Sequence, residues 1–272
     1  MQIPKWVRQS FISSSDFLIR YWPQPVPDIS LLEQCKIVSH RGEYDNSKVK
    51  ENTISAFEAV YKAGVWGLEL DIRWTKNMVP VVIHDEDCRR VYNESVKISD
   101  IDVSELKKRI PEIPTLEEVI DRYGGEMHLM IELKKERYPN PKYQNQVLES
   151  LLKAYDACID YHLISLHPVM FNYIQFTVPD VFLPVSEANY RQFSYLALNR
   201  PYGGITGHFM FLSNKYVLRH HRASQKVGTG FIDSKNCLFR EINRGIDWIF
   251  TNKAIEMQRI IREILNQYVG NR

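Results

Sequence analysis

The sequence predicts a single α/β domain built as a closed (β/α)8 barrel, a TIM barrel. Short apolar runs alternate with longer helical patterns along most of the 272 residues, and this alternation is typical of a parallel sheet covered by helices. No GxGxxG or GxxxxGK motif follows any of the apolar runs, which argues against a doubly wound nucleotide-binding sheet. About eight strand–helix units over roughly 240 residues suit a closed barrel better than an open sheet.

Nine segments have the short apolar pattern of strands. In chain order they are Lys36–His40, Gly67–Ile72, Val79–His84, His128–Leu133, His162–Leu166, Val181–Val185, Thr206–Phe211, Val227–Ile232 and Trp248–Thr251.

Helices are expected between most of these strands. Asn52 or Thr53 can cap the first of them, which ends at Gly64. Thr115 opens a second, and a last amphipathic helix covers Ile255 to Val269.

Residues 1–34 differ in pattern from the remaining chain. Aromatic and apolar residues are scattered among polar ones, and Pro23, Pro25 and Pro27 follow. This predicts one or two short helices and then an extended connector. We expect residues 1–34 to form an N-terminal extension that caps one end of a single barrel domain at residues 35–272. A membrane-surface anchor is the alternative, although the segment has hardly any basic polar face.

Charge and composition exclude several classes of protein. Lys and Arg total 35 against 33 Asp and Glu, a net charge of +2, so no nucleic-acid partner is expected. The mean hydropathy of −0.33 and the lack of a long apolar run predict no transmembrane helix. No secretory signal is visible, so we expect a cytoplasmic location. Four cysteines without a CxxC pair indicate neither a zinc site nor disulfides. Membrane contact and oligomeric state stay open.

Acidic residues in two predicted strands indicate a metal site. Strand alternation places Glu69 and Asp71 on one face of their strand, opposite an apolar face, and it places Glu132 and Lys134 on one face of another. With the apolar faces against helices, these carboxylates point into the barrel, where unpaired carboxylates are costly. Three such groups form an oxygen-rich set that suits Mg²⁺ or Ca²⁺. A network of structural salt bridges is the alternative.

Two histidines end predicted strands next to these carboxylates. His40 leads into Arg41, and His84 leads into Asp85. Such a pair favours acid–base chemistry. With Arg41 and Lys134 as cations, the set suits a phosphate ester, because cations stabilise its oxygens while histidines move protons. His128 lies near the start of its strand and is expected at the opposite end of the barrel.

Taken in order, a series of short motifs resembles the glycerophosphodiester phosphodiesterase family over about residues 35–265. The motifs are His40-Arg41-Gly42, Glu51-Asn52-Thr53, Glu69-Leu70-Asp71, His84-Asp85 and Glu132-Leu133-Lys134, with weaker matches at Ile113–Val119 and Asp247–Asn252. The resemblance implies a TIM barrel of the phospholipase-C-like type. It also implies metal-dependent hydrolysis of a glycerophosphodiester, or a related lysophospholipid, to an alcohol and a glycerol 3-phosphate-type product.

The resemblance also implies a role for each matching residue. By position, it implies that Glu69, Asp71 and Glu132 bind one divalent cation, Mg²⁺ or Ca²⁺, and that His40 and His84 are the acid–base pair. It further implies that Arg41 and Lys134 bind the phosphate and that Glu51 and Asn52 are supporting residues. We expect His84 to be the base and His40 the acid. Asn52 either orders the loop or caps a helix, and Glu51 either pairs with Arg41 or favours the helix N-terminus.

One stretch departs from the family pattern. Gly230 stands where many members carry a tryptophan near the seventh strand, so we expect a wider pocket there. Tyr44, Trp74, Phe209 and Phe211 are candidates to replace that wall, although packing roles are the simpler expectation. Alternative functions are a lysophospholipase D or phospholipase-like enzyme, a non-catalytic phosphate-binding barrel, or a scaffold. The headgroup of the substrate is not determined by the sequence.

Overall fold

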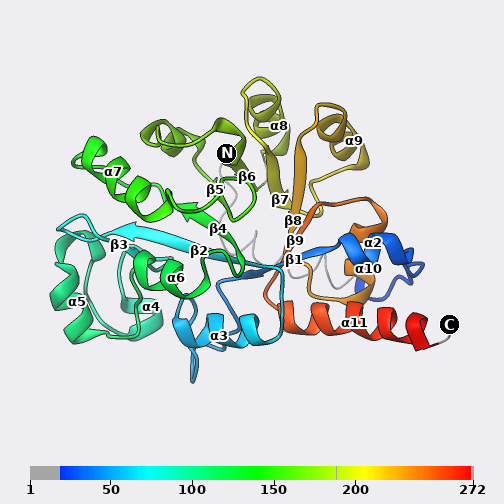
Figure 1. The fold of residues 1–272 in the computed structure, drawn as a ribbon, viewed down its shortest axis with the longest axis horizontal. Coiled ribbons are helices and arrows are strands. Elements are labelled where there is room, and N and C mark those ends of the chain that lie inside the picture. Colours follow the sequence, from blue (N-terminus) through cyan, green and yellow to red (C-terminus); the bar gives the residue numbers. More distant parts are fainter. Residues whose placement is uncertain (1–18, 188, 271–272) are drawn as a thin grey trace.

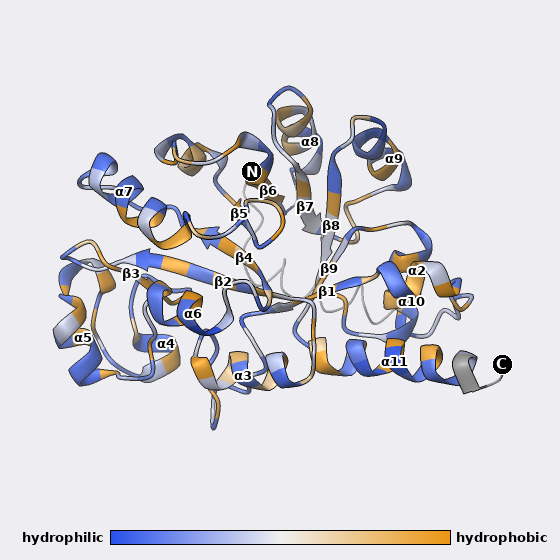
Figure 2. Ribbon diagram, viewed as in Figure 1, coloured by the Kyte–Doolittle hydropathy of each residue, from blue (hydrophilic) through white to orange (hydrophobic). Residues whose placement is uncertain are grey.

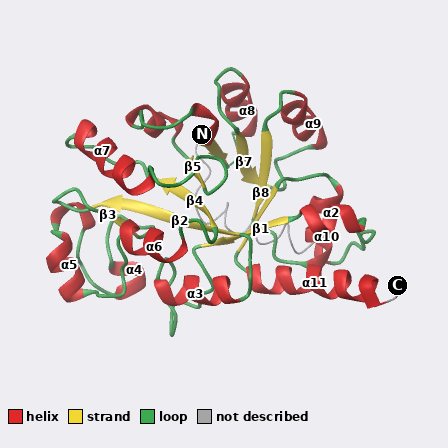
Figure 3. Ribbon diagram, viewed as in Figure 1, coloured by secondary structure: helices red, strands yellow, loops and turns green. Residues whose placement is uncertain are grey.

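The computed structural model describes residues 19–187 and 189–270 and shows a closed barrel surrounded by helices (Figure 1 and Figure 3). Its parallel strands are β1 (Lys36–His40), β2 (Gly67–Trp74), β4 (His128–Leu133), β5 (Tyr161–Ser165), β6 (Phe182–Ser186), β7 (Gly204–His208), β8 (Lys226–Gly230) and β9 (Trp248–Thr251). Strand β1 pairs with both β2 and β9, which closes the ring. The TIM barrel predicted from the sequence is confirmed.

One of the nine predicted strands is not part of the parallel barrel. Strand β3 (Pro80–Val82) runs antiparallel to β2 and lies outside the ring of parallel strands. The connection from Trp74 to Pro80 is a turn closed by a hydrogen bond from Thr75 N to Val79 O at 3.1 Å. A parallel crossover needs a dozen or more residues, so this short turn can only form a hairpin.

Helices cover the outside of the barrel. They are α2 (Ile29–Gln34), α3 (Ile54–Lys62), α4 (Arg89–Tyr92), α5 (Val103–Arg109), α6 (Leu116–Tyr123), α7 (Pro141–Leu152), α8 (Tyr190–Leu198), α9 (Asn214–Arg222), α10 (Lys235–Asn243) and α11 (Ala254–Gly270). The hydroxyl of Thr53 caps α3, and Thr115 with Glu118 forms a capping box at α6. Between β5 and β6 the chain forms 3-10 turns instead of an α-helix.

The strands have two different faces. Leu68, Leu70 and Ile72 pack with helix residues in the main core, whereas Val38 and Met130 belong to a separate cluster inside the barrel. Figure 2 shows hydrophobic and hydrophilic residues alternating along the helices, as expected when one face of each helix is buried. Among residues 19–187 and 189–270, no helix combines the length and apolar character needed to cross a bilayer.

Two segments lie beside the barrel. Residues 83–113, which contain α4 and α5, have a small core of their own and form the lobe at the left of Figure 1. Helix α2 follows the prolines in the stretch that we expected to be extended. Residues 1–18 of the predicted extension lie outside the described residues, and the division into residues 1–34 and 35–272 stays a prediction.

His128 lies at the end of the barrel where the strands begin, as expected from its position in β4. Its Nδ1 donates to the carbonyl of Ile159 at 2.7 Å, and its Nε2 lies 2.8 Å from Nδ1 of His162. Trp66 stacks on His128 with ring centroids 4.4 Å apart. Burial lowers the pKa of His128 to about 4. Burial and repulsion from His128 lower the pKa of His162 to about 2. Both rings are therefore neutral near pH 7.

Acid should destabilise the protein through this pair. Above the ordinary histidine pKa of 6.5, both rings are neutral in the folded and unfolded states. Below it, only the unfolded chain takes up these protons, so stability should fall as the pH drops from 6.5 toward 4. In His162→Asn, the fall in melting temperature over that range should be smaller than in the wild type. Equal profiles for the wild type and His162→Asn would contradict the assignment.

Candidate active site

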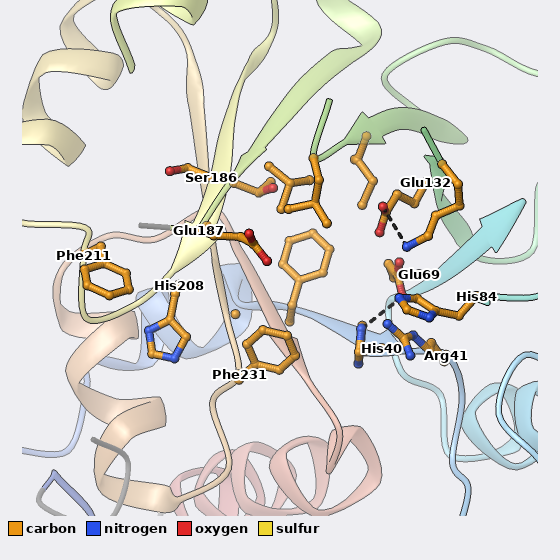
Figure 4. A pocket seen from close by; sticks show the side chains of 18 residues that line it. His40, Arg41, Glu69, His84, Glu132, Ser186, Glu187, His208, Phe211 and Phe231 are labelled. Carbon is orange, nitrogen blue, oxygen red and sulfur yellow. Dashed lines mark hydrogen bonds and ion pairs between the residues drawn. The ribbon is translucent and has the colours of Figure 1, made fainter. Parts of the chain in front are cut away.

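A pocket opens at the carboxyl ends of the strands, where barrels of this kind build their sites. One half is charged and is lined by His40, Arg41, Glu69, His84, Glu132 and Lys134. The other half is mainly apolar and is lined by Ile164, Leu166, Val185, Phe211, Phe231 and Phe250, with Glu187 and His208 among them. Figure 4 shows His40, Arg41, Glu69, His84 and Glu132 on one side and Glu187, Phe211, Phe231 and His208 on the other.

The carboxylate of Asp71 has no exposed surface and contacts two cations of the charged half, Arg41 and Lys134. Arg41 Nε approaches its Oδ2 at 3.0 Å, and Asn52 Nδ2 donates to the same oxygen at 2.9 Å. Lys134 Nζ donates to Oδ1 at 2.9 Å and to Glu132 Oε1 at 2.9 Å. Burial alone would raise the pKa of Asp71, but Arg41 and Lys134 hold that pKa well below its usual range. Asp71 therefore stays ionised.

Glu69, Asp71 and Glu132 fit a divalent cation. One oxygen from each lies within 4.8 Å of the others. Ligand oxygens lie about 2.0–2.6 Å from Mg²⁺ or Ca²⁺, so oxygens on one ion are within roughly 5 Å of each other. Oε2 of Glu69 is buried and accepts no hydrogen bond from the described residues. Burial and the charge of Asp71 raise the pKa of Glu69, and a cation beside this carboxylate would favour its ionised form.

The loop between β1 and α3 positions Arg41 and Asn52, which both contact Asp71. Arg41 and Gly42 both have left-handed backbone, with φ of 62° and 86°, and a Cβ on Gly42 would lie 2.8 Å from the backbone carbon of Ala56. Only glycine tolerates so close an approach. Asn52 also has left-handed φ and bonds Asp71, while Thr53 caps the helix. The cap of α3 is thus Thr53 and not Asn52, and the backbone N–H of Asn52 donates to the carbonyl of Arg41 in the loop after β1 at 3.0 Å; the role of Asn52 in ordering that loop stays a prediction.

His40 faces the cluster with one ring nitrogen. Its Nδ1 lies 2.7 Å from Oδ1 of Asn252, an acceptor, so Nδ1 carries the proton. Its Nε2 lies 3.9 Å from Glu69 Oε2. Burial and the neighbouring charge of Arg41 lower the pKa of His40 to about 3, so the free protein holds a neutral ring with a lone pair on Nε2.

His84 is held from two directions. Its Nδ1 lies 2.6 Å from Oδ1 of Asp85, and its backbone carbonyl accepts a hydrogen bond from Arg73 Nε at 2.8 Å. Burial lowers the pKa of His84, although Asp71 and Asp85 act in the opposite direction. A carboxylate on Nδ1 leaves Nε2 to face the pocket and stabilises the ring when it gains a proton.

Several residues of the site were not singled out from the sequence. Asn252 belongs to the weak match at the last strand, and Asp85 to the His-Asp pair, so both had a signal. Arg90 had none: its guanidinium donates to both oxygens of Glu51 at 2.6 and 3.0 Å and to Asp85 at 2.5 Å. Glu51 also accepts from Arg41 at 3.0 Å, so the predicted pairing of those two residues is present.

The aromatic wall of the pocket differs from the candidates named from sequence. Phe211 lines the pocket, together with Phe231 and Phe250. Phe231 meets the ring of His40 edge-on at 5.2 Å. Trp74 packs against Tyr138 at 5.7 Å and Phe209 is fully buried, so both serve the core. Tyr44 also packs against the core.

Gly230 ends β8 at the edge of the pocket. The nearest described heavy atom to a Cβ built there would be Phe250 Cβ at 3.6 Å, an ordinary contact, and its φ lies outside the positive range. By contrast, a Cβ on Gly207 would lie 2.7 Å from the carbonyl oxygen of Ser186. Glycine at 230 is therefore not required by the backbone, and its effect is to leave space in the pocket.

Comparison with known sequences identifies one family. The model of the glycerophosphoryl diester phosphodiesterase family matches residues 40–176. The glycerophosphodiester phosphodiesterase of Bacillus altitudinis is 35% identical over 129 residues, which cover 43% of this chain and 52% of that protein. The enzyme of the same name from Caldanaerobacter subterraneus is 34% identical over 127 residues, 42% of this chain and 51% of that protein. The match thus spans about half the length of these relatives.

Solved structures share the fold over most of the chain. The glycerophosphodiester phosphodiesterase of Thermotoga maritima superposes with a TM-score of 0.68 at 23% identity, covering 83% of this chain and 98% of that one. A phosphodiesterase of Oleispira antarctica, solved in complex with the product sn-glycerol-3-phosphate, gives 0.69 at 21% identity over 84% and 96% of the two chains. At these identities the likeness concerns the fold.

Removing the unpaired carboxylate should abolish metal binding without harming the fold. In Glu69→Gln we expect no increase in melting temperature on adding Mg²⁺ or Ca²⁺, whereas the wild type should be stabilised by either ion that binds. Without metal, the variant should be at least as stable as the wild type, because a buried carboxyl that prefers to be neutral becomes an amide. Glu136→Gln, at a carboxylate outside the cluster, should respond to metal like the wild type. A full metal response in Glu69→Gln would contradict the site.

Proposed function

The chain belongs to the glycerophosphoryl diester phosphodiesterase family, and we propose that it hydrolyses a glycerophosphodiester to an alcohol and a glycerol 3-phosphate-type product. One observation carries this proposal: three clustered carboxylates, two cations and two histidines meet in one pocket at the carboxyl ends of the strands. The names of the relatives and the product bound to the Oleispira enzyme support the choice of substrate.

The charges of the site suit a singly charged phosphodiester. Glu69, Asp71 and Glu132 oppose Arg41 and Lys134, which leaves one uncompensated negative charge when all are ionised. A divalent cation on the three carboxylates reverses that sign. When bound, such an ion polarises a phosphate oxygen and lowers the pKa of a hydroxyl or water beside it.

Arg41 and Lys134 are proposed to bind the phosphate. Each already neutralises a carboxylate, and each lines the pocket. A guanidinium has five N–H donors and an ammonium has three, so the ion pairs of Arg41 and Lys134 with the carboxylates leave donors for the oxygens of a substrate. In a buried site such charge-assisted hydrogen bonds are stronger than in water. Both cations would therefore stabilise negative charge that develops on the phosphate.

His84 and His40 are proposed to move the protons. We assign the base to His84, because Asp85 on its Nδ1 stabilises the imidazolium that forms when Nε2 accepts a proton. His40 is assigned as the acid toward the leaving alcohol. Its pKa is low in the free protein, but a phosphate anion bound beside the ring favours its protonated form.

A lysophospholipid is a second candidate substrate, and the apolar half of the pocket favours it. Phe211, Phe231 and Phe250, together with Leu166 and Val185, line the side opposite the charges. An acyl chain attached to the glycerol arm would be buried there with a gain of about 25 cal/mol per Å² of apolar surface. Purified protein should be assayed with glycerophosphocholine and lysophosphatidylcholine in parallel.

The proposed reaction requires metal and both histidines. We expect turnover of at least one of the two substrates with divalent metal and none in EDTA. His40→Ala and His84→Ala should each lower kcat on the order of 10²–10⁴-fold, the usual scale for a positioned acid or base, while the melting temperature stays close to that of the wild type. His221→Ala, at an exposed histidine near the opposite end of the barrel, should retain full activity. A soluble His40 or His84 variant with near-normal kcat would remove that residue from the mechanism.

Filling the space at Gly230 should change substrate preference. Gly230→Trp places a ring in the apolar half, so we expect a lower KM for glycerophosphocholine, a higher KM for lysophosphatidylcholine, or both. Tyr195→Trp, which puts a tryptophan in place of the exposed tyrosine of α8, should leave both KM values unchanged. Unchanged KM values in a folded Gly230→Trp protein would show that residue 230 does not contact substrate.

A further inference from the structure

We propose that Arg90 is a positioning residue that couples the phosphate-binding arginine, Arg41, to the proposed base, His84. This inference rests on the proposed function of the site. Arg90 lies in the short helix α4, outside the ring of strands, and it is not among the residues that line the pocket. Its side chain nevertheless reaches two carboxylates, Glu51 and Asp85, that each hold a site residue.

The first connection runs through Glu51. Arg90 Nη2 and Nη1 donate to Oε1 and Oε2 of Glu51 at 2.6 and 3.0 Å, a bidentate pair. Glu51 in turn accepts from Arg41 Nη1 at 3.0 Å and from Asn46 Nδ2 at 2.7 Å. The side chain of Glu51 is only 4% exposed. A bidentate contact fixes the plane of a carboxylate as well as its position, so Arg90 orients the acceptor that holds Arg41.

The second connection runs through Asp85. Arg90 Nε donates to Oδ2 of Asp85 at 2.5 Å, and the other oxygen of Asp85 lies 2.6 Å from Nδ1 of His84. The guanidinium of Arg90 thus donates from Nε to Asp85, which contacts His84, and from both terminal nitrogens to Glu51, which contacts Arg41. The sign of the charge alternates along Arg41, Glu51, Arg90 and Asp85, so each contact strengthens its neighbour.

The exposure of these groups separates positioning from simple stabilisation. The side chain of Arg90 is 47% exposed, and ion pairs at exposed positions contribute little to stability. The groups that it orients are less exposed, at 4% for Glu51, 14% for Arg41, 25% for Asp85 and 32% for His84. Arg90 contacts both Glu51 and Asp85, so its charge offsets the repulsion between these two carboxylates. Loss of Arg90 should therefore disturb the site more than the fold.

Arg90→Ala provides the test, with Arg89→Ala as matched control. Arg89 is the exposed neighbour on the same helix and forms no ion pair with the described residues. On glycerophosphocholine or lysophosphatidylcholine with divalent metal, Arg90→Ala should lower kcat about tenfold or more through His84 and raise KM through Arg41, with a melting temperature close to that of the wild type. Arg89→Ala should match the wild type, and Arg90→Lys, which can keep one of the two pairs, should fall between.

A double-mutant cycle locates the effect. If Arg90 acts on His84 through Asp85, then adding Arg90→Ala to Asp85→Asn should lower kcat no further than Asp85→Asn alone. Fully additive losses in kcat would overturn the proposal. So would an Arg90→Ala protein with kcat and KM within twofold of the wild type, or one that loses no more than Arg89→Ala.

Failure of the proposed function is recognised separately, because the wild type would then turn over neither substrate. In that case, the proposed coupling of Arg90 to His84 can still be tested by NMR. The ring nitrogens and Nδ1 proton of His84 should shift in the NMR spectrum of Arg90→Ala relative to wild type, since Asp85 loses the hydrogen bond that it accepts from Arg90, and should not shift in Arg89→Ala. Unchanged His84 signals in Arg90→Ala would overturn the inference whatever the substrate.

Discussion

The buried carboxylate of Asp71 is the interaction on which the rest of the site depends. A fully buried, ionised carboxylate costs several kcal/mol of desolvation unless cations and hydrogen-bond donors surround it. Here Arg41, Lys134 and Asn52 supply them. These partners come from the loop after β1, the end of β4 and the entry to α3, so satisfying one side chain brings three separate segments together.

Other contacts extend outward from that centre. Lys134 also holds Glu132, and Arg41 also holds Glu51. Glu51 accepts hydrogen bonds from Arg90, which also donates to Asp85, and Asp85 contacts His84. Glu69 is the exception, because its buried Oε2 lies 3.9 Å from His40 and accepts no hydrogen bond from the described part of the chain. A network that satisfies every carboxylate except this one has the charge pattern of a site prepared for a cation.

The pocket has a charged half and an apolar half because different strands of the barrel contribute different side chains. Strands β1, β2 and β4, with the hairpin strand β3, present charged groups at their ends, whereas β5 to β9 contribute mainly apolar side chains and two glycines. Charged groups in such surroundings interact more strongly than in water because fewer solvent dipoles screen them. The same surroundings keep His40 neutral in the free protein. The pocket therefore places a charged half beside an apolar half.

The sequence alone determined the barrel and the grouping of its carboxylates. Alternation of side chains along a strand is a local rule, so Glu69 and Asp71 had to share a face opposite Leu68, Leu70 and Ile72, and parallel strands had to bring Glu132 to the same end. Only the tertiary structure decided that β3 turns back against β2, that Phe231 and Phe250 rather than Trp74 and Phe209 face the pocket, and that Arg90 and Asn252 support the site. These features depend on contacts between residues far apart in the chain, such as Asn252 with His40 and Arg90 with Glu51, and no local pattern records which distant side chains meet.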